Sequence, residues 1–91
     1  MFDWDQANLR KIRAHNISRL EVEEALRSFP IPIYDQVVGH ESRFIYYGET
    51  KRGRLLALVV TDREERTRVV TAYDLDAGQK RDYLQRRANG E

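Results

Sequence analysis

The chain has 91 residues, 41% apolar and 34% charged, with a formal net charge of +1 at pH 7 and no cysteine. This length allows one small domain with a single core, and so small a net charge is no argument for nucleic-acid binding. The lack of cysteine excludes disulfides, thiolate metal ligands and a cysteine nucleophile. With no signal-peptide pattern and no apolar run near the ~20 residues of a membrane-spanning helix, we expect one cytoplasmic domain over residues 1–91.

Two short helices are predicted at the start. Asp5 can cap a first helix that ends near His15-Asn16, where asparagine tolerates a left-handed conformation. Ser18, with Glu21 three residues later, forms a capping box that opens a second helix. The segment Pro30–Pro32 ends that helix and forces an extended exit. The first third is therefore predicted to be a helical hairpin.

The middle of the chain has β character. Four strands are predicted, at Ile31–Val38, Arg43–Thr50, Arg54–Thr61 and Thr67–Tyr73. The turns between them are short, which favours an antiparallel meander. Prolines at the start of the first strand place it at an edge. The run Leu55–Val60 is apolar on both alternating faces, so the third strand is predicted to lie centrally with both faces covered.

Asp76 and Gln79 form a second capping box, which starts a final helix that runs to about Ala88. Its apolar content is thin, so it is either loosely docked or held by a partner. The predicted class is α+β, with an N-terminal helical hairpin, a four-stranded antiparallel meander and a C-terminal helix.

The register of the strands follows if Thr50 pairs with Arg54 and Thr61 pairs with Thr67. One sheet face, expected beneath the helical hairpin, then carries Phe44, Tyr46, Leu56, Leu58, Val60, Val70 and Ala72. The other face carries Arg43, Ile45, Tyr47, Leu55, Ala57, Val59, Val69, Thr71 and Tyr73.

Arginine is concentrated from Lys51 to Arg68 and again in the final helix. Guanidinium forks suit phosphate, and the neighbouring tyrosines offer faces for unpaired bases. Solvated arginines and half-buried strand tyrosines fit the same pattern.

Metal chemistry is not indicated, because no cluster of histidine and carboxylate residues has ligand spacing. His40 with Glu41 fits an acid–base pair or an ordinary polar turn. RNA brings its own nucleophile, the 2′-hydroxyl, so a protein without a metal can still cleave it by positioning and proton transfer.

Ordered short motifs run through nearly the whole chain, at Phe2–Asp5, Asn8, His15–Ser18, Glu23–Ala25, Phe29, Tyr34-Asp35, His40-Glu41, Arg43, Gly48, Arg54–Leu56, Arg68–Ala72 and Tyr83. Together they resemble the BrnT family of bacterial toxins, which have a RelE-like fold. The resemblance implies a ribonuclease that cuts RNA without a metal or cofactor and inhibits translation. It also implies a partner, a ribbon-helix-helix (BrnA-like) antitoxin. Operator DNA would then be bound only by the complex with that antitoxin.

Carried over by position, the resemblance gives roles to eight residues. Arg54 and Arg68 would bind phosphate, and Tyr83 and Glu41 would transfer protons or contact a base. Substrate contacts would come from Arg43, Lys51, Arg52 and Tyr73. Many family members have an arginine where this chain has Tyr73 followed by Asp74. The chain then either belongs to a Tyr-Asp branch or is a weakened member, and the alternative function is a non-catalytic BrnT-like module that binds protein or RNA.

Overall fold

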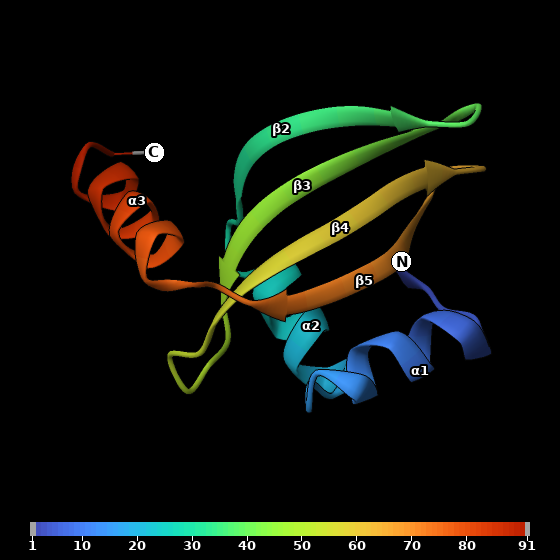
Figure 1. The fold of residues 1–91 in the computed structure, drawn as a ribbon, viewed down its shortest axis with the longest axis horizontal. Coiled ribbons are helices and arrows are strands. Elements are labelled where there is room, and N and C mark those ends of the chain that lie inside the picture. The colour runs from blue at the N-terminus through green and yellow to red at the C-terminus, as the bar shows by residue number, and fades with distance from the viewer. Residues whose placement is uncertain (1, 91) are drawn as a thin grey trace.

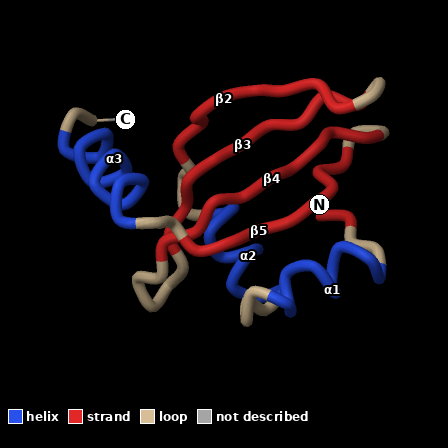
Figure 2. Tube along the Cα trace, in the orientation of Figure 1, coloured by secondary structure: helices blue, strands red, loops and turns tan. Residues whose placement is uncertain are grey.

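The computed structural model describes residues 2–90. Its elements in chain order are β1 (Phe2–Asp3), α1 (Gln6–Ala14), α2 (Arg19–Arg27), β2 (Ile31–Val38), β3 (Glu41–Glu49), β4 (Leu55–Arg63), β5 (Arg66–Asp74) and α3 (Ala77–Ala88). The strands form one sheet in the order β1-β5-β4-β3-β2. Helices α1 and α2 lie on one side of it, and α3 stands at one end (Figure 1). Figure 2 separates these helices from the curved sheet by colour.

The α+β class and the three helices agree with the prediction, but the sheet is larger than a four-stranded meander. The first two described residues form β1, which runs parallel to β5 with Phe2 opposite Thr67 and Asp3 opposite Arg68. The sheet is therefore five-stranded and mixed. A strand of two residues has no period from which it could have been predicted.

The predicted helix caps are all present. Asp5 Oδ1 accepts a hydrogen bond from the Asn8 N–H at 2.8 Å, and capping boxes open α2 and α3. The helical hairpin is looser than predicted, because α1 packs on β5 whereas α2 packs on β3 and β4. At one point α2 lies so close to β3 that a Cβ atom on Gly48 would be 2.9 Å from a carbonyl oxygen of the helix.

The predicted register is correct between β3 and β4, where Phe44 pairs with Val60. Between β4 and β5 it is wrong, because Thr61 pairs with Arg68 rather than with Thr67. Two features move the register. The turn is shorter than predicted, with only residues 64 and 65 between the strands, and a bulge lies between Val59 and Val60.

Buried side chains lie on both faces of the sheet, and the bulge determines which face Val69 and Val70 occupy. Beneath the helices, Val69 takes the place that was predicted for Val70, and Val70 packs on the opposite face with Ile45 and Val59. Strand β4 contributes buried side chains to both sides, so the central position predicted for it is confirmed. Helix α3 is anchored on the opposite face by Tyr83, which is only 3% exposed.

Candidate functional site

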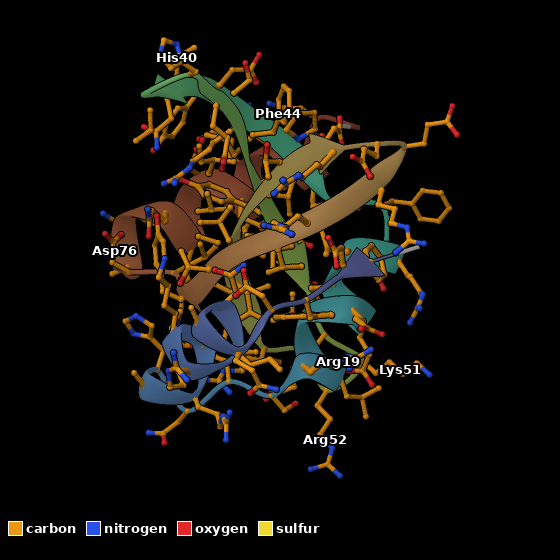
Figure 3. All side chains as sticks on the ribbon, turned by 90° about the vertical axis from the view of Figure 1, so that its right-hand side faces the viewer. Arg19, His40, Phe44, Lys51, Arg52 and Asp76 are labelled. Carbon is orange, nitrogen blue, oxygen red and sulfur yellow. The ribbon has the colours of Figure 1, made fainter. Side chains whose placement is uncertain are left out.

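The predicted site residues separate into groups at the two ends of the sheet. Arg54 lies just before β4, whereas Arg68 pairs with Thr61 near the far end of that strand. Thr61 lies seven positions after Arg54, which at ~3.3 Å per residue is about 23 Å. Figure 3 shows the same division, with His40 at the opposite end from Lys51 and Arg52. One phosphate therefore cannot be bound by both Arg54 and Arg68.

Arg54 is held by groups from three parts of the chain. Its Nε and Nη2 donate to the two carboxylate oxygens of Asp74 at 2.7 and 2.9 Å. Its Nη1 donates to Glu21 Oε2 at 3.1 Å and to the Asn16 carbonyl at 2.9 Å. A longer contact, 3.4 Å, joins Nη2 to the His15 carbonyl. Five contacts match the five N–H donors of a guanidinium, so Arg54 has no donor left for a phosphate.

The electrostatics of this group, which we call the Arg54 clamp (Arg54, Asp74, Glu21 and the carbonyls of His15 and Asn16), favour full ionisation. Hydrogen bonds from Arg54 lower the pKa of the Asp74 carboxyl. The pKa of Glu21 is lowered chiefly by the backbone N–H of Ser18 and further by Arg54. The pKa of Arg54 is raised, first by its hydrogen bonds to Asp74. The clamp ties the β4 and β5 ends to the α1–α2 connection.

Lys51 and Arg52 lie in the turn after β3, and both are exposed. Neither side chain forms an ion pair within residues 2–90. They border a groove of about 490 Å³ along the first turn of α2, together with Glu21 and Glu24. Glu24 Oε1 accepts a hydrogen bond from the Lys51 backbone N–H at 3.2 Å. These two cations are free to meet a polyanion, but carboxylates lie close to them.

A polar row crosses the other end of the sheet. Arg68 lies between Asp3 on β1 and Thr61 on β4, and extending the β3–β4 register by one pair brings Arg43 beside Thr61. Because Thr61 alternates with Val60, whose side chain lies beneath the helices, the row lies on the face that α1 and α2 leave open. We call this set (Arg43, Thr61 and Arg68) the arginine row.

Both arginines of the row are ion-paired and partly accessible. Arg68 donates to Asp3 Oδ2 at 3.2–3.3 Å, and it lies 3.8 Å from Asp5. Arg43 Nε donates to Glu41 Oε1 at 3.2 Å. The side chains of Arg43 and Arg68 are 28% and 27% exposed. A phosphate on this row would have to share the guanidinium groups with carboxylates.

Of the two predicted site tyrosines, Tyr83 lies on α3 and Tyr73 lies close to the end of β5. The Tyr83 hydroxyl donates to Glu49 Oε1 at 3.2 Å and accepts from Arg87 Nε at 3.1 Å, so this buried side chain acts as an anchor. Tyr73 is half-buried opposite Ala57, and burial raises the pKa of its hydroxyl. The structure does not bring either tyrosine to the arginine row.

A hollow opens where the two hairpin tips separate. The paired residues of β3 and β4 end at Phe44 and Val60, and beyond them Thr61 Oγ1 donates to the Ser42 carbonyl at 2.7 Å. The hollow has a volume of about 710 Å³ and is lined by Val38, His40, Glu41, Ser42, Phe44, Thr61, Asp62 and Arg63. We call it the hairpin-tip cleft. The sequence drew attention to His40 and Glu41, but only the strand register brings Asp62 and Arg63 to them.

One family model, described as the ribonuclease toxin BrnT of type II toxin–antitoxin systems, matches residues 4–78. The chain belongs to the BrnT family. It is therefore a member of a family of ribonuclease toxins whose type II systems include an antitoxin partner. No curated protein matches the sequence. This match tests none of the roles predicted for individual site residues, and it ends before Tyr83.

Three further observations describe this BrnT-family chain. No group of three or more histidine and acidic side chains within residues 2–90 could hold a metal ion, and no helix in that range is long and apolar enough to cross a membrane. The Tyr73-Asp74 departure also has a structural consequence, because Asp74 is the bidentate partner of Arg54. From the sequence alone, this departure indicated only a Tyr-Asp branch or a weakened member of the family.

Proposed function

We propose that this BrnT-family protein is a metal-independent endoribonuclease that inhibits translation in the cytoplasm. The observation that carries the proposal is the family match over residues 4–78. The arginine row supports it, because it offers two partly exposed guanidinium groups on the sheet face that α1 and α2 leave open. Arginine forks bind phosphate oxygens in pairs and keep their charge at any working pH.

The proposed substrate contacts follow from the two ends of the sheet. Arg43 and Arg68 would contact the RNA backbone near the scissile bond, with Glu41 as a proton-transfer group. Lys51 and Arg52 would contact a more distant part of the strand, because they lie at the other end of β4. Tyr73 could stack an unpaired base only near that second end. Arg54 and Tyr83 stay predictions from resemblance, and their contacts are those of structural side chains.

We also propose that the antitoxin is of the ribbon-helix-helix (BrnA-like) type and that only its complex with this chain binds operator DNA. Family membership supports an antitoxin partner. The small net charge of +1 supports an indirect route to DNA, since the chain alone lacks the charge excess of a DNA-binding protein. A ribbon-helix-helix reading frame beside the gene, and co-purification of its product, would test this pairing.

A second candidate function is a non-catalytic BrnT-like module that binds protein or RNA. A specific observation favours it: Arg54 contacts two carboxylates, and so does Arg68. An arginine must give up such partners before it binds phosphate, which weakens its contribution. The two functions differ in whether RNA is cut.

The deciding experiment is an RNA-cleavage assay in excess chelator. We expect the purified wild type to cut RNA, and Arg43→Ala and Arg68→Ala to slow cleavage more than tenfold. Arg10→Ala is the matched control, because Arg10 is exposed on α1 and forms no ion pair within residues 2–90. Folded wild type that leaves RNA intact, with or without Mg²⁺, would reject catalysis and favour the binding module.

A further inference from the structure

We propose that the hairpin-tip cleft is the reaction centre of this protein, with His40 and Glu41 as its proton-transfer groups and Arg63 as its phosphate ligand. The inference rests on the proposed ribonuclease function and names where the RNA strand is cut. None of the residues to which the resemblance gave a phosphate-binding role lines this cleft.

The reaction itself sets what the site must contain. The 2′-oxygen forms a bond to phosphorus while the bond from phosphorus to the 5′-oxygen breaks. One protein group takes the proton of the 2′-hydroxyl, and another gives a proton to the departing 5′-oxygen. A cation neutralises the phosphorane-like charge. The products are a 2′,3′-cyclic phosphate and a 5′-hydroxyl, and proton exchange with water restores both groups.

The cleft brings two proton-transfer groups together. His40 and Glu41 both line it, at the turn and at the first residue of β3. Glu41 is ion-paired with Arg43, so its carboxylate offers acceptor oxygens and suits the base. Imidazole can carry and release a proton near neutral pH, which suits His40 as the acid. Tyr83, the alternative proton donor, is buried with its hydroxyl engaged.

Arg63 differs from the arginines that the sequence pointed to. Arg54 and Arg68 each face two carboxylates, whereas Arg63 is exposed and forms no ion pair or hydrogen bond through its side chain within residues 2–90. It can therefore bind a phosphate without first releasing a partner. Asp62 is the one lining carboxylate that has no ion-pair partner within those residues.

The shape of the cleft fits a single nucleotide at the end of the arginine row. Its volume of about 710 Å³ lies within the range of small-molecule sites. The partly buried Phe44 ring on its wall offers a stacking face. Thr61 belongs to both the row and the cleft, and Arg43 joins them through Glu41. A strand bound along the row therefore leads into the cleft.

The test uses matched pairs of the same residue type. His40→Ala changes an exposed turn residue in the cleft, and His15→Ala changes the other histidine, which lies at the end of α1. Arg63→Ala removes the proposed ligand, and Arg66→Ala changes the residue opposite it across the turn, which does not line the cleft. Each variant is assayed for RNA cleavage with and without added imidazole, and melting temperatures confirm folding.

We expect His40→Ala to lose about 100-fold in cleavage rate, in line with general acid–base catalysis, and to regain part of it with imidazole. Arg63→Ala should lose at least tenfold, and both controls should stay within threefold. Products should carry 2′,3′-cyclic phosphate ends. Normal cleavage by folded His40→Ala, loss without imidazole rescue, or 3′-hydroxyl products would overturn the proposal. Wild type that cuts no RNA would instead reject the proposed function itself.

Discussion

Replacing Arg54 with alanine should destabilise the fold, because Arg54 is the centre of the clamp. The change removes ion pairs to Asp74 and Glu21, whose side chains are 54% and 31% exposed. Pairs this exposed contribute ~0.5–1 kcal/mol each, and the two backbone carbonyls lose hydrogen bonds of ~0.5–1 kcal/mol each. The sum is about 2–4 kcal/mol. For a chain of this size that corresponds to a fall in melting temperature of roughly 10–30 °C.

The assay is thermal unfolding followed by circular dichroism, with Arg52→Ala as the matched control. Arg52 is exposed in the neighbouring turn and forms no ion pair within residues 2–90, so its removal should shift the melting temperature by less than 3 °C. Arg54→Lys should recover part of the loss, because lysine keeps the charge but not the forked geometry. A melting temperature unchanged in Arg54→Ala, together with lost RNA cleavage, would refute the clamp and restore Arg54 as a phosphate ligand.

Three further predictions concern stability. In the folded protein the carboxyl groups of Asp74 and Glu21 have pKa values below their usual 3.8 and 4.5. The stabilisation that they contribute is therefore present above those usual values and is lost as the pH falls below about 4.5. Melting temperatures measured from pH 6 to pH 3 should fall less steeply in Arg54→Ala than in the wild type, and an equal slope would contradict this. Glu64 and Glu65 have φ values of 51° and 66°, so a Glu64→Asn/Glu65→Gly double change should add about 1 kcal/mol in urea unfolding, whereas a loss would exclude turn strain. Gly48→Ala should cost ~1–3 kcal/mol in the same assay, because its Cβ would meet a backbone oxygen of α2 at 2.9 Å; a neutral effect would show that the helix can shift.

The local parts of the fold were predictable and the pairings between distant residues were not. Capping boxes at Ser18 and Asp76 lie within four residues of chain, so their residue types alone identified the helix starts. The apolar run from Leu55 likewise identified the central strand. The position of Val70 depended on a bulge that no residue type signals, and one inserted residue exchanges the faces on either side of it.

In the candidate site, too, the pairing of charged residues that are distant in the sequence could not be predicted. From the sequence, Asp74 was expected to weaken a phosphate-binding surface. Its partner in the structure is Arg54, 20 residues away, and a pairing over that distance cannot be read from the chain. The structure pairs it with Arg54, so the same charge stabilises the fold. His40 and Arg63 are both polar residues in the sequence, but 23 positions separate them. Only the splayed hairpin tips place both of them on one cleft.

The clamp and the cleft together account for the departure at Tyr73-Asp74. An arginine after Ala72 would have placed another cation near Arg54, and that end of the sheet would then favour a phosphate. With Asp74 present, all five donors of Arg54 face protein groups, so Arg54 has a structural role at that end of the sheet. The arginine with a free guanidinium on β4 is Arg63, at the other end of the same strand. If RNA is cut, the chemistry therefore belongs at the hairpin tips, and a Tyr73→Arg/Asp74→Ala variant should lose stability without gaining cleavage.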